Sequence, residues 1–164
     1  MIAEPDVIDE IAGLAPGSRL FELRRQRPEV VRHSQAGYDA LIRPRQPGGV
    51  SPAERAAVAL RVAARNGASD LAAHYRALLA ERDPDGRLAG FDGAADEPDA
   101  RLAAVRRHVD RVAAAPGTAT QAHIDELARH GIGARELVTI SQLVAFVSYQ
   151  ARVLAGLRLL REVP

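Results

Sequence analysis

The sequence predicts an all-α protein: a single domain built as a bundle of about six to eight helices around a central helix hairpin. Its 164 residues are a normal length for one domain and can bury a hydrophobic core without disulfides or metals. Hydrophobic residues make up 47% of the chain, aromatic residues only 4%, and alanine is frequent. Alanine has the highest intrinsic helix propensity, so this composition favours closely packed helices.

The N-terminal part of the chain carries start and stop signals for three helices. Asp6 can cap a short amphipathic helix that ends at a Pro-Gly pair, and Ser18 can cap a second one. Pro28 suits the first position of a longer helix that buries Tyr38. The proline- and glycine-rich residues 43–49 then interrupt helical structure.

Residues 51–75 predict a helix–turn–helix. Ser51 and Glu54 have the spacing of a capping box, with proline at the first helical position between them. An Asn-Gly pair ends this helix, because glycine is favoured just past a helix C-terminus. Asp70, or the serine before it, can cap the next helix.

The second half of the chain predicts a loop and three further helices. The acidic loop at residues 83–98 is not a calcium loop, because arginine and alanine stand where the EF-hand pattern needs oxygen ligands. Helices are expected at about 99–115, in a short stretch after it, and from 133 to 161. The last segment is apolar around much of its circumference, which indicates a central helix or one shared with another subunit.

The residue types that are missing exclude several classes of chemistry. The chain has no cysteine, which excludes thiol peroxidase, disulfide and thiolate–metal chemistry. All 22 basic residues are arginine, which excludes a Schiff-base or P-loop lysine and is typical of high-GC bacterial genomes. The five histidines have no metal-binding spacing on one helix, so we expect neither a metal nor another cofactor.

The net charge and the hydropathy pattern limit the kinds of partner that we expect. A net charge of +1 gives no reason to expect nucleic acid or an anionic membrane. The N-terminal residues are acidic where a signal peptide is basic, and we expect no stretch that reaches the length of a membrane span. A cytoplasmic protein is therefore expected.

Two stretches resemble a known superfamily. They are residues 51–75, SPAERAAVALRVAARNGASDLAAHY, and residues 131–160, GIGARELVTISQLVAFVSYQARVLAGLRLL. They are similar to the helix–turn–helix and the C-terminal helix of the carboxymuconolactone decarboxylase and alkylhydroperoxidase D-like superfamily, in its peroxidase-related branch. The resemblance implies such a helical domain at 35–164, an N-terminal helical extension at 1–34, and a homo-oligomer, from dimer to hexamer.

The chain departs from the peroxidase pattern at each catalytic position. That pattern places a glutamate one helix before a Cys-x-x-Cys pair and a histidine after it. With the Asn-Gly pairs matched, the glutamate, the two cysteines and the histidine are replaced by Ala56, Ala68, Leu71 and Tyr75. His74 lies one residue before the expected position. The resemblance therefore implies the scaffold without a thiol peroxidase site.

The candidate catalytic residues are His74, Asp70 and Glu54. Asp70 and His74 are four residues apart, so both lie on one face of a helix. A carboxylate there can fix the tautomer of the imidazole and support acid/base work. In the alternative interpretation, Asp70 only complements the helix dipole and Glu54 only completes its capping box.

The candidate substrate-binding residues are Arg61, Tyr75, Tyr149 and Arg152. Arg61 lies one turn from Arg65, and such a pair can hold a carboxylate. Tyr75 occupies the family's histidine position. Tyr149 and Arg152 lie on the most hydrophobic helix, where polar groups must find partners. The alternatives are surface positions for Arg61 and Arg65 and oligomer contacts for Tyr149 and Arg152.

Two functions follow from this reading. The first is acid/base chemistry on a small carboxylated or lactone substrate, in a Cys-less member of the superfamily. The second is a non-catalytic ligand-binding or interaction protein that keeps the scaffold. The expected partners are further copies of the chain and a small-molecule ligand, and the sequence leaves both functions open.

Overall fold

The computed structural model describes residues 5–93 and 98–162. Residues 1–4 of the predicted N-terminal extension, 94–97 of the predicted acidic loop, and 163–164 lie outside this part. Over the described residues the fold contains eight α-helices, one short 3-10 helix (Pro116–Thr118) and no β-strand, which confirms the all-α class. The helices are α1 (Val7–Ala12), α2 (Arg19–Arg25), α3 (Pro28–Ile42), α4 (Pro52–Arg65), α5 (Ser69–Arg82), α6 (Ala100–Ala114), α7 (Gln121–Arg129) and α8 (Ala134–Glu162).

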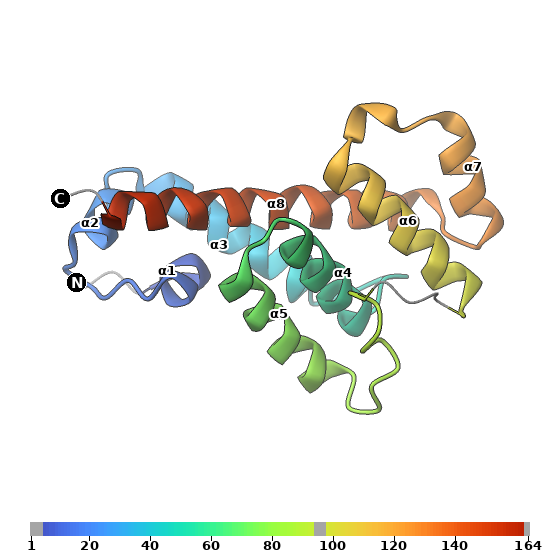
Figure 1. Cartoon of the computed structure of the whole chain (residues 1–164), viewed down its shortest axis with the longest axis horizontal. Coiled ribbons are helices and arrows are strands. Elements are labelled where there is room, and N and C mark those ends of the chain that lie inside the picture. The colour runs from blue at the N-terminus through green and yellow to red at the C-terminus, as the bar shows by residue number, and fades with distance from the viewer. Residues whose placement is uncertain (1–4, 94–97, 163–164) are drawn as a thin grey trace.

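The long helix α8 organises the bundle. It runs along the molecule, with α1 and α2 near its C-terminal end and α6 and α7 near its N-terminal end (Figure 1). It contacts α1, α2, α3, α4 and α6. A single hydrophobic core joins residues from Val7 to Leu157. The apolar composition of this segment thus corresponds to a central helix.

The α4–α5 hairpin forms as the sequence predicts. The hydroxyl of Ser51 accepts a hydrogen bond from the backbone N–H of Glu54 at 3.2 Å, and the Glu54 carboxylate accepts one from the backbone N–H of Ser51 at 2.8 Å. Gly67 adopts a left-handed φ of 66° in the turn. The predicted cap of α5 is wrong, because Ala68 occupies the cap position and no side chain caps the helix.

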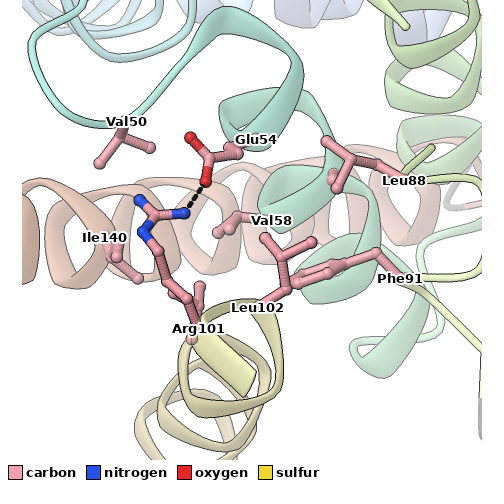
Figure 2. A pocket seen from close by; sticks show the side chains of 10 residues that line it. Val50, Glu54, Val58, Leu88, Phe91, Arg101, Leu102 and Ile140 are labelled. Carbon is pink, nitrogen blue, oxygen red and sulfur yellow. Dashed lines mark hydrogen bonds and ion pairs between the residues drawn. The ribbon is translucent and has the colours of Figure 1, made fainter. Parts of the chain in front are cut away.

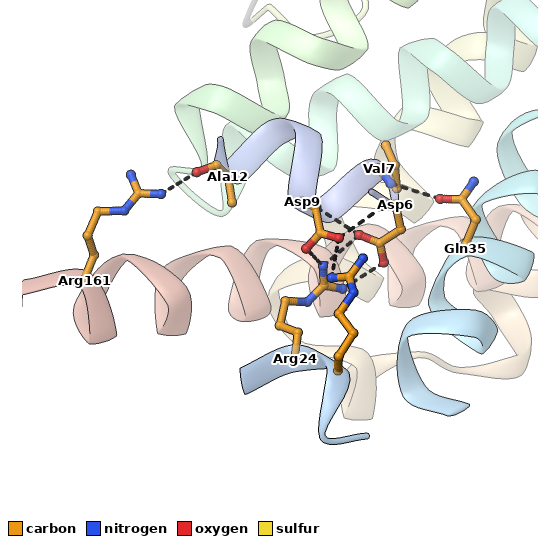
Figure 3. A network of polar contacts seen from close by, with 8 residues as sticks. Asp6, Val7, Asp9, Ala12, Arg24, Gln35 and Arg161 are labelled. Atoms are coloured by element: carbon orange, nitrogen blue, oxygen red, sulfur yellow. Dashed lines mark hydrogen bonds and ion pairs between the residues drawn. The ribbon is translucent and has the colours of Figure 1, made fainter. Parts of the chain in front are cut away.

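A buried network of charges holds the N-terminal helices (Figure 3). Arg24 on α2 forms ion pairs with Asp6 and Asp9 at the start of α1, and Arg25 lies 2.6 Å from Asp9. The backbone N–H of Val7 donates to the side chain of Gln35 on α3. The predicted boundary between residues 34 and 35 falls inside α3, so the N-terminal helices and the rest form one structural body.

The structure corrects one expectation about α8. By length and composition alone, its 29 residues suffice to cross a membrane, with a mean hydropathy of 1.4 in the best window. Within that window 44% is buried inside the protein.

Candidate functional site

His74 interacts with a side chain from another helix that the sequence did not single out as a site residue. Its Nε2 atom is 2.9 Å from the hydroxyl of Tyr38, which comes from α3. The imidazole on α5 is half-buried, whereas Tyr38 is buried. Two helices separated by the α4 segment therefore bring an imidazole and a phenol into hydrogen-bonding distance.

The surroundings favour the neutral imidazole. Burial lowers the pKa of His74, and the positive charge of Arg43 lowers it further. Burial also raises the pKa of Tyr38, against the opposing effect of Arg43, so the phenol keeps its proton at neutral pH. The hydrogen bond can run in either direction: Tyr38 can donate to Nε2, which places the ring proton on Nδ1, or Nε2–H can donate to the phenol oxygen, which leaves the Nδ1 lone pair free to accept a proton.

Arg43 is a cation whose charge acts on both members of this pair, and Arg82 acts on Tyr38 as well. The guanidinium carbon of Arg43 lies 5.4 Å from the centroid of the Tyr38 ring, and its side chain is exposed just after the end of α3. An exposed guanidinium has free donors for a planar anion such as a carboxylate. This cluster therefore combines a neutral imidazole, a phenol and an exposed guanidinium.

Tyr75 lies beneath His74 and is sealed from solvent. Its hydroxyl donates to Oε1 of Gln150 on α8 at 2.5 Å, and both side chains are 0% exposed. The His74 ring packs edge-on against the Tyr75 ring, with centroids 5.1 Å apart. Burial raises the pKa of Tyr75. Tyr75 is therefore closed to solvent in this structure, and it packs against the imidazole from inside the core.

Asp70 does not support His74 as predicted. Its carboxylate accepts a hydrogen bond from Arg158 on α8 at 3.0 Å and lies 3.5 Å from the hydroxyl of Ser69. Asp70 is exposed, while the imidazole of His74 turns inward to Tyr38. Asp70 and His74 share one face of α5 but have different surroundings. Helix α8 supplies the partner of Asp70, and helix α3 supplies the partner of His74.

Glu54 also lies apart from His74. Its carboxylate forms an ion pair with Arg101 on α6 in addition to its capping bond (Figure 2). The pair stands at one side of a small apolar pocket, whose other walls include Val50, Val58, Leu88, Phe91 and Ile140. The predicted partnership with His74 is therefore replaced by a contact between α4 and α6.

A larger polar cleft adjoins this pocket. It has a volume of about 660 Å³, and Glu54 and Arg101 line both cavities. Its other polar walls carry charges of both signs, from Arg82, Asp83, Asp85, Arg87 and Asp99. The mixed charges give the cleft no clear preference for an anion or a cation.

Arg61 has a structural partner. Its Nε and Nη2 atoms donate to the two carboxylate oxygens of Asp110 on α6, each at 2.7 Å. Nη1 donates to the backbone carbonyls of Phe91 and Gly93. Arg65 lies 3.5 Å from the same carboxylate. The predicted carboxylate clamp therefore exists, but it holds a side chain of the protein.

Tyr149 and Arg152 do not lie on the buried face of α8 that carries Gln150. Tyr149 is half-buried and lines a groove between α3 and α8, with its ring centroid 6.2 Å from that of Phe146. Arg152 is exposed. Neither is among the residues that interact with His74, so the predicted binding residues do not converge on one pocket.

The described part of the chain holds no group of three or more histidine and carboxylate side chains that could ligate a metal.

No protein-family model, curated protein or solved structure matches the sequence or the fold.

Sequence reasoning missed two residues of the site. Tyr38 is predicted only as a buried side chain, and Arg43 only as part of a helix-breaking segment. Both become visible only in the fold, where Tyr38 on α3 reaches His74 on α5, because neither shares a motif or a helix with His74. The signal in the sequence is weak: a tyrosine on a buried helix face, followed five residues later by an arginine.

Proposed function

We propose that this chain is a Cys-less protein of the carboxymuconolactone decarboxylase and alkylhydroperoxidase D-like superfamily. In this proposal His74 transfers a proton to or from a small carboxylated or lactone substrate. The hydrogen bond of 2.9 Å between His74 and Tyr38 supports it most directly, because a partly buried neutral imidazole held by a phenol is suited to acid/base work.

Each residue then has a defined role. His74 is the proton acceptor through Nδ1, in the tautomer whose Nε2–H donates to the Tyr38 oxygen, and its lowered pKa keeps the ring neutral at neutral pH. Tyr38 fixes the orientation of the ring, and Arg43 binds the substrate carboxylate in place of the predicted Arg61. Tyr75 packs beneath the ring and limits its movement.

The test is a screen of small carboxylates and lactones, followed by kinetics of variants. His74→Ala is expected to lower kcat at least about 100-fold, the usual contribution of a positioned acid or base. Arg43→Ala should mainly raise KM for carboxylated substrates. His33→Ala serves as the matched control, because His33 is an exposed histidine on α3 outside the site. Full turnover by folded His74→Ala would refute the proposal.

A second candidate is a ligand-binding or interaction protein without catalysis. It is favoured by Arg61 and Asp70, two predicted site residues that the structure pairs with other side chains of the protein. Binding of a carboxylate that shifts the NMR signals of His74, with no turnover of any compound in the screen, would support this alternative.

We also propose a bacterial, cytoplasmic setting. The lysine-free, arginine-rich composition supports the bacterial part. Cell fractionation of the native host would test the compartment, and recovery of the protein with membranes would contradict it.

A further inference from the structure

The polar cleft and the small apolar pocket share one wall. It consists of Glu54 on α4, Leu88 in the turns after α5, and Arg101 and Leu102 on α6, and we call it the shared wall. The cleft has a volume of about 660 Å³, within the range of small-molecule sites of about 300–1,000 Å³. The pocket offers about 10 Å³, which is room for one water-sized group. A ligand in the cleft can therefore reach charged and apolar side chains at the same place.

Three other charged side chains of the cleft hold backbone groups. Arg82 donates to two backbone carbonyls. Asp83 and Asp99 each accept a hydrogen bond from a backbone N–H. The ion pair between Glu54 and Arg101 is instead a contact between two side chains, and it lies on the shared wall (Figure 2). It is therefore a charged contact that a ligand can exchange without disturbing the backbone.

Each head group of this ion pair keeps a second partner. Oε1 of Glu54 accepts from Nη1 of Arg101, while Oε2 accepts from the backbone N–H of Ser51 at 2.8 Å. Nη2 of Arg101 donates to the backbone carbonyl of Gly49 at 3.1 Å. The side chains of Glu54 and Arg101 are 18% and 33% exposed, so both are partly withdrawn from water. When the contact between Nη1 and Oε1 is exchanged, the second partners keep both head groups in position.

A ligand with a single charge leaves one member of this pair unsatisfied. A carboxylate that binds Arg101 separates Glu54 from its cation, and an amine that binds Glu54 separates Arg101 from its carboxylate. A charge that is partly withdrawn from water is destabilised when its partner is lost. A zwitterion avoids this loss, because its carboxylate accepts from Nη1 and its ammonium donates to Oε1. One ion pair is then replaced by two.

We propose that the shared wall binds a free α-amino acid with an aliphatic side chain. Its carboxylate binds Arg101, its ammonium binds Glu54, and its side chain packs on Leu88 and Leu102 at the entrance of the apolar pocket. The two head groups of the protein are in direct contact, so the two charges of the ligand must lie close together. An α-amino acid meets this condition because one carbon carries both charges.

The cleft has the character that such a ligand requires. Its exposed rim carries one charge of each sign, on Asp85 and Arg87. A ligand without net charge meets no net repulsion there. Leu88 is buried and Leu102 is partly buried, so an aliphatic side chain gains apolar contact on the shared wall. The wall has no residue in common with His74, Tyr38 and Arg43, so the proposal does not depend on the proposed function.

A ligand series on the wild-type chain tests the pairing of charges without any substitution. L-Leucine is the probe, isocaproate is its analogue without the ammonium group, and isoamylamine is its analogue without the carboxylate. Calorimetry is expected to give leucine a Kd below about 1 mM and at least about 10-fold below that of either analogue. Glycine lacks the side chain and should also bind at least about 10-fold more weakly. The methyl NMR signals of Leu88 and Leu102 should shift on addition of leucine.

Substitutions assign each charge of the ligand to its partner. Glu54→Gln keeps a capping box, because glutamine also suits that position, and it should bind leucine no more tightly than isocaproate. Arg101→Gln should bind leucine no more tightly than isoamylamine. Glu126→Gln and Arg107→Gln are the matched controls, since these residues form an ion pair of 2.6 Å that does not line the cleft. Both controls should bind leucine as the wild type does, and circular dichroism checks that every variant is folded.

Three outcomes would overturn the proposal. The first is wild-type protein that binds leucine no more tightly than about 1 mM, or no more tightly than isocaproate or isoamylamine. The second is folded Glu54→Gln or Arg101→Gln that binds leucine as the wild type does. The third is an equal loss of binding in the control variants. Tighter binding of leucyl-leucine than of leucine would contradict the placement of both charges on one carbon and would assign the shared wall to a peptide.

Discussion

Replacement of Tyr75 by phenylalanine removes one hydroxyl from the centre of the protein. That hydroxyl donates to Gln150 at 2.5 Å, and both side chains are 0% exposed. This bond is made by Oε1, and the Nε2 atom of Gln150 has no hydrogen-bond partner in the described part of the chain. Tyr75→Phe therefore leaves a buried amide with no partner at either end, at a cost of about 1–3 kcal/mol. This is a large share of a typical unfolding free energy of about 5–15 kcal/mol.

A double-mutant cycle separates this hydrogen bond from the packing. Gln150→Leu alone leaves the Tyr75 hydroxyl buried without an acceptor and is expected to destabilise by a similar amount. The double variant removes both polar groups and leaves an apolar contact of similar shape. It should therefore be more stable than the sum of the single effects predicts, by about 1–2 kcal/mol.

Urea unfolding followed by circular dichroism measures each free energy, at one fixed protein concentration so that association does not change the comparison. Each kcal/mol should lower the melting temperature by about 2–4 °C in a chain of this length. Tyr149→Phe is the matched control and should change stability by less than about 0.5 kcal/mol. Additive single effects would refute the reasoning, because they would show that the two groups do not depend on each other.

Three further outcomes are expected. Burial raises the pKa of Asp6, but its arginine partner outweighs this and holds it below the ordinary value, so its stabilisation is present above about pH 4 and lost as the pH falls. Asp6→Asn should flatten that acid loss in urea unfolding at successive pH values. Asp110→Ala leaves the buried guanidinium of Arg61 without its carboxylate and should lower the unfolding free energy by about 3 kcal/mol. Arg43→Ala should raise the pKa of His74 in an NMR titration, because a nearby positive charge is removed.

Local signals in the sequence predicted the helices well. The capping box at Ser51 and Glu54 and the left-handed glycine at residue 67 appear where the pattern placed them. These features depend on neighbours three or four residues away, which the sequence displays directly. The cap of α5 was predicted incorrectly, since Ser69 and Asp70 both had suitable side chains and the chain began the helix one residue earlier.

The contacts of the candidate residues could be predicted only in part. His74 is a candidate because of its place in the hairpin, but its partner Tyr38 is 36 residues away and belongs to another helix. Asp70 and Arg61 had the correct chemistry and the wrong partners. A charged side chain pairs with the opposite charge that packing brings closest, and here those charges come from Arg158 and Asp110.

The sequence by itself determined the all-α class, the hairpin at 51–75 and the absence of thiol chemistry, because propensity, capping and composition are local properties. Only the tertiary structure decided which side chains meet. It joined His74 to Tyr38, sealed Tyr75 against Gln150, and left one face of α8 uncovered. The physical reason is that helix periodicity fixes the face on which a residue lies, whereas the packing of helices distant in the chain fixes what that face contacts.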